Sequence, residues 1–181
     1  MTPPFLQPND QIRIVSPSGV IDPTYIDGAI KAITSWRLQV TEGEFARAEY
    51  GRFAGTQEQR IADLQAALDD ADVKAILCSR GGYGVAQIID KLDFSKFTAN
   101  PKWLIGFSDI TILHSAISNL GIASIHGIMA KHLTELPASS ELVQGLKDIL
   151  FGTLPHYTIP THHLNRNGSA QGKLIGGNLS V

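Results

Sequence analysis

The feature that most constrains the fold is a fivefold alternation of short apolar runs with segments of helical period along residues 1–152. The run at residues 73–79 is apolar almost throughout, as is typical of a strand covered on both faces of a sheet. We expect strands at residues 12–17, 38–43, 73–79, 102–107 and 122–127, and helices at residues 23–36, 55–70, 85–92, 109–121 and 139–152. This order predicts a doubly wound, flavodoxin-like α/β fold, in which a parallel sheet with right-handed crossovers carries helices on both faces.

Helix-end signals support this division. Thr56 and Gln59 have the spacing of a capping box at the start of the second expected helix. Gly121 and Gly152 follow the last residues of two other expected helices, where glycine is the favoured C-terminal cap.

The pattern changes after Gly152, where the chain becomes polar, contains two prolines and shows no helical period. We therefore divide the chain into an N-terminal α/β domain, residues 1–152, and residues 153–181, a linker with the first strand of a truncated C-terminal domain. Because the sequence stops shortly after a Gly-Gly-Asn motif without an obvious finish, we expect a fragment of a longer protein rather than a natural truncation.

Composition excludes several classes of protein. The chain has 15 Lys and Arg against 17 Asp and Glu, with no basic run, which argues against nucleic-acid or anionic-membrane binding. The single cysteine, Cys78, excludes an intrachain disulfide framework and fits a reducing compartment. The first residues lack the pattern of a signal peptide, and no apolar run is long enough to span a bilayer. These observations predict a soluble cytoplasmic protein.

Three loops follow expected strands at the edge of the sheet where such folds bind ligands: Ser-Pro-Ser-Gly at residues 16–19, Ser-Arg-Gly-Gly-Tyr-Gly at residues 79–84 and Gly-Phe-Ser-Asp at residues 106–109. A phosphate cradle is one interpretation, but the loops lack the P-loop ending and the dinucleotide spacing, and Asp109 would repel a phosphate. Tight turns that need glycine are another interpretation of the second loop.

Ser108 allows two interpretations. It can be the N-cap of the following helix, since serine is a favoured cap. Alternatively it is a nucleophile on a sharp strand-to-helix turn, although the motif lacks the second glycine of G-x-S-x-G. The N–H group of Asp109 and an N–H group of residues 81–84 could then form an oxyanion hole.

A serine nucleophile needs a base, and the candidates among the histidines are weak. His126 ends an expected strand and could lie near Ser108, but we favour a loop or pocket-lining role for it. His114 lies too far along its helix to face the hydroxyl. Adjacent His162 and His163 would point to opposite sides of an extended segment, so we expect no metal site and no cofactor. Cys78 is expected to be a buried, inert thiol.

The segments LQPNDQIRIVSPSG, RFAGTQEQRIADLQAALDDADVKAILCSRGGYG, NPKWLIGFSDITILHSAI and IHGIM, in this order, resemble the LD-carboxypeptidase family. This family includes murein tetrapeptide carboxypeptidases and microcin-immunity carboxypeptidases. The resemblance covers nearly the whole chain, and the pair SRGGYG and GFSDIT is its most specific part.

The resemblance implies a cytoplasmic, homodimeric serine peptidase of cell-wall recycling, which cleaves the L,D peptide bond of murein tetrapeptide and releases D-alanine. It makes Ser108 the nucleophile as well as a helix cap, and it makes the backbone N–H groups of Gly82 and Asp109 the oxyanion donors. To the substrate pocket we assign Ser16, Arg80, Tyr83 and His126.

One departure limits the resemblance. In the family, a glutamate and a histidine of the C-terminal domain complete the triad, and neither can be assigned to a position of this chain. Residues 1–181 alone are therefore expected to be inactive. Two alternatives stay open: a microcin-immunity carboxypeptidase that acts on a peptide–nucleotide antibiotic, and a non-catalytic module that binds a peptide or nucleotide.

Overall fold

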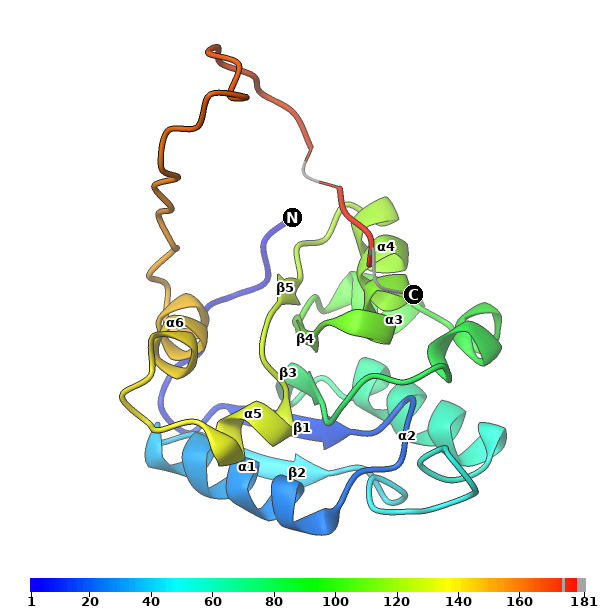
Figure 1. Cartoon of the computed structure of the whole chain (residues 1–181). Helices are drawn as coiled ribbons and strands as arrows, with labels where there is room; N and C mark the ends of the chain where they lie inside the picture. The colour runs from blue at the N-terminus through cyan, green and yellow to red at the C-terminus, as the bar shows by residue number, and fades with distance from the viewer. Residues whose placement is uncertain (174, 179–181) are drawn as a thin grey trace.

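The computed structural model describes residues 1–173 and 175–178, and within them five strands form one parallel sheet (Figure 1). The strands are β1 (Gln11–Val15), β2 (Gln39–Glu42), β3 (Val73–Cys78), β4 (Trp103–Gly106) and β5 (Ile125–His126). Their order in the sheet is β2-β1-β3-β4-β5, so the connections reverse direction after β2. This order is flavodoxin-like and confirms the predicted doubly wound fold.

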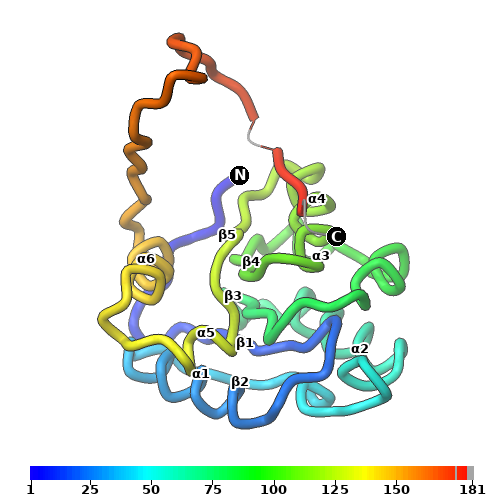
Figure 2. The backbone as a smooth tube through the Cα atoms, in the orientation of Figure 1, coloured from blue at the N-terminus to red at the C-terminus, as the bar shows by residue number. Residues whose placement is uncertain are grey.

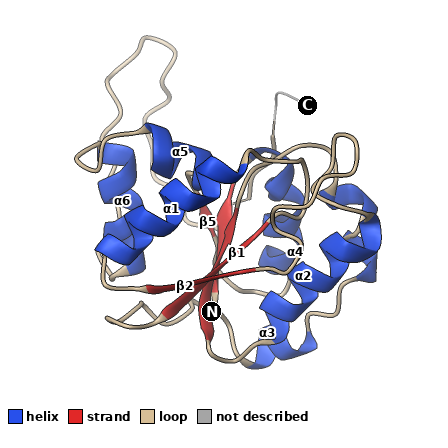
Figure 3. Ribbon diagram, turned by 90° about the horizontal axis from the view of Figure 1, so that it is seen from below, coloured by secondary structure: helices blue, strands red, loops and turns tan. Residues whose placement is uncertain are grey.

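Helices cover both faces of the sheet, as predicted (Figure 3). One face carries α1 (Pro23–Ser35), α5 (Ala130–Glu135) and α6 (Glu141–Leu150), and the other carries α2 (Gln57–Asp69), α3 (Ser95–Ala99) and α4 (Thr111–Asn119).

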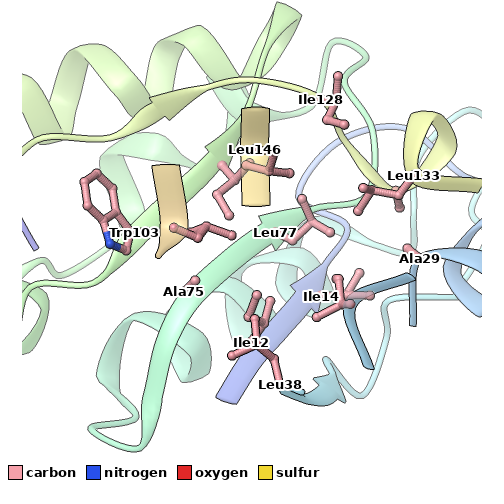
Figure 4. Packing of buried hydrophobic residues seen from close by; sticks show 14 of the residues in the cluster. Ile12, Ile14, Ala29, Leu38, Ala75, Leu77, Trp103, Ile128, Leu133 and Leu146 are labelled. Carbon is pink, nitrogen blue, oxygen red and sulfur yellow. The ribbon is translucent and has the colours of Figure 1, made fainter. Parts of the chain in front are cut away.

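Each face of the sheet has its own apolar core. Ile12, Ile14 and Leu77 pack in the core beneath α1, α5 and α6 (Figure 4). Ile76 and Cys78 belong to the core on the opposite face. Because successive side chains of a strand point to opposite faces, a strand between two helical layers is apolar at nearly every position.

The second expected helix begins as predicted. The Thr56 side chain accepts a hydrogen bond from the N–H group of Gln59, and the Gln59 side chain accepts one from the N–H group of Thr56. The prediction of one helix at residues 85–92 is wrong. Two short 3₁₀ turns, η1 (Val85–Gln87) and η2 (Ile89–Lys91), lie there instead. No side chain caps either turn.

The segment from residue 153 to residue 178 contains no helix or strand in its described part. It leaves α6 as an exposed loop and returns to α4 (Figure 2), where Lys173 donates a hydrogen bond to the carbonyl of Ser118. Leu174 and residues 179–181 lie outside the described residues. The division at residue 152 stays a prediction. None of the described helices has the length and apolar character that a membrane crossing requires.

Candidate active site

Ser108 lies on a strained turn directly after β4. Its φ is 62°, in the left-handed region that residues other than glycine seldom adopt. The extended Phe107 precedes it, and the 3₁₀ turn η3 (Ser108–Ile110) leads from it into α4. This is the strand, strained turn and helix arrangement of a nucleophile elbow, which exposes a serine above the sheet.

The expectation that Ser108 also caps the helix is wrong. Phe107 precedes η3 and Ile110 precedes α4 as the cap residues, and neither makes a side-chain cap hydrogen bond. The strain at Ser108 is thus not accounted for by capping. Backbone strain of this kind is concentrated at functional sites.

The glycine loop after β3 packs directly on Ser108. A Cβ atom added to Gly81 would lie 3.0 Å from Ser108 Cβ, 3.1 Å from Ser108 Oγ and 3.4 Å from the Asp109 nitrogen. Gly82 has a φ of 155°, and a Cβ atom there would lie 2.6 Å from Ser18 Oγ. The loops after β1, β3 and β4 therefore meet at the carboxyl edge of the sheet, as the fold prediction required.

The side chain of Asp109 accepts hydrogen bonds from two neighbouring loops. One carboxylate oxygen, Oδ2, accepts hydrogen bonds from Ser18 Oγ at 2.6 Å, from the Gly84 N–H group at 2.9 Å and from the Val85 N–H group at 3.0 Å. The sequence gives no direct sign of these contacts, because Ser18 and Asp109 are separated by most of the domain. The backbone N–H group of Asp109 is not among these donors.

Ser108 lies in a cleft of about 780 Å³. Of the residues assigned from the sequence, Arg80, Gly82, Tyr83 and Asp109 line this cleft together with Ser108. The cleft is also lined by Asp22, Lys131 and His132, for which the sequence carries no site signal, as well as by Gly177 and Asn178.

Two assigned residues lie elsewhere. Ser16 is 3% exposed, and its hydroxyl group contacts the carbonyl of Ala46 at 2.6 Å and Ser79 Oγ at 2.7 Å, so it supports the loops and lines neither described cleft. His126 is exposed in a second cleft of about 670 Å³, which shares Thr111, Ser115 and Gly177 with the Ser108 cleft. We therefore do not keep either residue in the proposed pocket.

His132 lies in the Ser108 cleft, where its ring is 5.3 Å from the ring of Phe107. It was missed because the short helix α5 was not predicted. Met129, which precedes α5, is not a residue type that signals a helix start from sequence.

His114 is held by two hydrogen bonds away from the cleft. Its Nε2 lies 2.9 Å from the Gly106 carbonyl and its Nδ1 lies 2.8 Å from Ser124 Oγ. Since a carbonyl only accepts, Nε2 carries the proton and Nδ1 accepts from the Ser124 hydroxyl group. Burial lowers the pKa of His114, which favours this neutral form.

Within the described residues, no group of three His, Cys, Asp or Glu residues could hold a metal ion. Cys78 is buried in β3, and burial raises the pKa of its thiol. The cleft therefore combines a strained serine, backbone N–H groups at a helix start, the cationic side chains of Arg80 and Lys131, and the side chains of Asp22 and His132.

Comparison with known proteins gives consistent matches. Residues 12–127 match the family model of the LD-carboxypeptidase N-terminal domain. A probable murein peptide carboxypeptidase of Bacillus subtilis is 35% identical over 99% of this chain and 57% of its own length. The murein tetrapeptide carboxypeptidase of Pseudomonas aeruginosa is 34% identical over 97% of this chain and 60% of its own length.

Among solved structures, an MccF-like protein from Bacillus anthracis matches 83% of this chain and 47% of its own chain, with a TM-score of 0.76 and 28% identity. The chain therefore spans less than two thirds of the relatives that it matches.

Proposed function

This chain belongs to the LD-carboxypeptidase family, and we propose that it is the nucleophile-bearing part of a serine-type LD-carboxypeptidase. The proposed reaction is hydrolysis of the L,D peptide bond of murein tetrapeptide with release of D-alanine, in cell-wall recycling. The observation that carries the proposal is Ser108, with a positive φ at the end of β4 and in contact with the Gly81–Gly82 loop.

In this reaction Ser108 Oγ attacks the carbonyl carbon of the scissile bond and forms a tetrahedral oxyanion. The N–H groups of Asp109 and Gly82 donate hydrogen bonds to the oxyanion. A base takes the serine proton and passes it to the leaving amine, so that D-alanine departs and an acyl-enzyme forms, which water then hydrolyses. The family resemblance assigns the base to a histidine with a glutamate partner in the C-terminal domain.

Arg80 is our candidate for binding a carboxylate of the substrate. Two cations with long side chains line the cleft, and Lys131 lies 3.7 Å from the Glu135 carboxylate. Arg80, by contrast, donates to the backbone carbonyl of Val20 at 2.9 Å and forms no ion pair within the described residues. A guanidinium group can bind a carboxylate with two parallel hydrogen bonds, and a carboxypeptidase must recognise the terminal carboxylate of its substrate. The exposed ring of Tyr83, which lies three residues after Arg80 and lines the same cleft, would cover the bound peptide.

We further propose a cytoplasmic homodimer. The family resemblance supports both properties, and a buried free Cys78 fits a reducing compartment.

A second candidate is cleavage of a peptide–nucleotide antibiotic, which is favoured by the match to an MccF-like protein. The test is to incubate the full-length protein with murein tetrapeptide, with the same peptide carrying an L,L terminal bond, and with a peptide–nucleotide. Release of D-alanine from the first substrate alone supports the proposal. Cleavage of the peptide–nucleotide alone supports the second candidate, and no cleavage with intact peptide binding supports a binding module.

A further inference from the structure

The Asp109 carboxylate joins the two loops that surround Ser108. Its Oδ2 atom accepts from Ser18 in the loop after β1 and from the N–H groups of Gly84 and Val85 after β3. Ser18 is fully buried, and its Oγ also accepts from the Gly84 N–H group at 3.0 Å. Three donors therefore converge on one oxygen of the residue that directly follows Ser108.

Arg60 of α2 holds the same loops from the other side. Its Nη1 donates to the carbonyl of Pro17 at 3.2 Å and to the carbonyl of Gly84 at 2.9 Å. The Arg60 side chain belongs to a residue that is only 2% exposed, and the charge of Asp109 partly offsets the lowering of its pKa by burial. Gly84 is thus fixed at both its N–H group and its carbonyl.

Gly81 and Gly82, which precede Gly84 in the loop after β3, are packed closely against the neighbouring loops. A Cβ atom on Gly82 would lie 2.6 Å from Ser18 Oγ and 2.9 Å from the Gly19 nitrogen, and one on Gly81 would contact Ser108. The Gly19 N–H group also donates to the Gly81 carbonyl at 3.3 Å. The position of the Gly82 N–H group relative to Ser108 is consequently set by the contacts of Ser18 and Asp109.

We propose that the Asp109 side chain and Ser18 are positioning residues, which hold the Gly81–Gly82 loop so that its N–H group meets the oxyanion formed at Ser108. This inference rests on the proposed function. It assigns to Asp109 a role for its side chain in addition to the role of its backbone N–H group. A preorganised donor acts on the transition state rather than on the bound substrate, because the negative charge exists only after attack.

The energetic consequence follows from geometry. A misplacement of about 1 Å in a reacting arrangement, or the loss of one oxyanion donor, lowers kcat by about 100-fold. A purely stabilising contact would instead lower the free energy of unfolding and leave the turnover of the folded enzyme unchanged. The two roles can therefore be separated by measuring kcat, KM and the melting temperature together.

The test compares Asp109→Asn and Ser18→Ala with a matched control, Asp70→Asn, in the full-length protein. Asp70 also accepts a hydrogen bond from a backbone N–H group, that of Asp72 at 2.9 Å, and pairs with Arg13 at 2.8 Å. It lies just before β3, at the opposite edge of the sheet. Two rates are measured: hydrolysis of murein tetrapeptide, and covalent labelling of Ser108 by a fluorophosphonate, whose phosphoryl oxygen needs the same donors.

An asparagine amide oxygen accepts weaker hydrogen bonds from the same three donors than a carboxylate oxygen does. We therefore expect Asp109→Asn and Ser18→Ala each to lower kcat by about 10-fold, with KM within about threefold and labelling slowed in proportion. Asp70→Asn should leave both rates within about twofold. In a Ser108→Ala background, Asp109→Asn should not change the Kd of the peptide.

Unchanged kcat and labelling in folded variants, or a loss that appears wholly in KM and in the peptide Kd, would overturn the inference. If Asp109→Asn does not fold, Ser18→Ala decides by the same criteria. If the wild-type protein is labelled but does not cleave murein tetrapeptide, the proposed substrate is wrong, and the labelling rates still decide whether Asp109 and Ser18 position the loop.

Discussion

Gly81 lies so close to Ser108 that a single added carbon on the glycine would be 3.1 Å from the serine hydroxyl oxygen. This contact between the loop after β3 and the turn after β4 places the backbone of Gly81 beside the strained serine. The proposed chemistry depends on this proximity.

The substitution Gly81→Ala tests whether catalysis depends on the close approach of Gly81 to Ser108. The new methyl group would push the glycine loop and Ser108 apart by a few tenths of an ångström, so we expect a loss of kcat of about tenfold or more with the fold retained. Gly145→Ala is the matched control, because an added Cβ there meets no atom within 4 Å and lies within α6. It should raise the free energy of unfolding by about 0.5–1 kcal/mol and leave kcat unchanged. Wild-type turnover in folded Gly81→Ala would show that the contact has no catalytic role.

The positive φ of Ser108 predicts that the backbone strain at this residue lowers the stability of the fold. Ser108→Gly relieves the strain, whereas Ser108→Ala retains it, so the glycine variant should be more stable than the alanine variant by about 1 kcal/mol. Both variants should be inactive. Urea unfolding of the two variants gives the difference, and an alanine variant as stable as the glycine variant would mean that the turn is unstrained.

His114 predicts a dependence of stability on pH. Its pKa is lowered chiefly by burial and also by the nearby His126, against an opposing effect of the hydrogen bond to Gly106. The unfolded chain therefore binds a proton more readily than the folded protein, and stability rises with pH in this range. We expect the contribution of neutral His114 to the free energy of unfolding to be complete above about pH 6.5. This contribution is lost as the pH falls through the pKa of His114 in the folded protein.

The measurement is the melting temperature between pH 7.5 and pH 5 for the wild type, His114→Gln and the control His156→Gln. His156 is exposed in the segment after α6. His114→Gln should flatten the decline on acidification and His156→Gln should not. Equal declines in all three proteins would assign the acid sensitivity to other groups.

The sequence predicts the sheet and its helical layers well, because buried parallel strands and amphipathic helices both leave periodic apolar patterns. The sequence predicts the ends of the helices, and the short helices, less well. Residues 85–92 have apolar spacing but form two short 3₁₀ turns that meet at Ile88 instead of one helix. Helix α5 was missed because Met129, which precedes it, carries no helix-start signal.

The candidate site is predicted in part. The motifs place Ser108, Gly82 and Asp109 at one edge, because the carboxyl ends of parallel strands meet there. Contacts such as Ser18 with Asp109, and the positive φ of Ser108, arise from tertiary packing and leave no periodic signal in the sequence. Ser16 and His126 were selected by the same reasoning, but the edge contains both a buried layer and a second cleft, which only the structure distinguishes.

Residues 1–181 alone are expected to release D-alanine negligibly. The family resemblance places the base in the C-terminal domain. Of the histidines of this chain, His132 lines the Ser108 cleft and His126 lines the second cleft. Without a base, the oxyanion donors and substrate binding leave a residual rate of roughly 10³–10⁴ over water in studied triads, far below full catalysis. An assay of this chain with Ser108→Ala and His126→Ala as controls checks the expectation. Robust release that both substitutions abolish would restore His126 as the base.

The central claim is that Ser108 is the nucleophile of an LD-carboxypeptidase. The most direct measurement is mass spectrometry of the full-length protein after reaction with a fluorophosphonate, together with D-alanine release from murein tetrapeptide by the same sample. We predict that the label is on Ser108, that D-alanine release falls in proportion to the fraction of protein labelled, and that Ser108→Ala folds normally but is neither labelled nor active. A folded Ser108→Ala protein that releases D-alanine at the wild-type rate would contradict the claim.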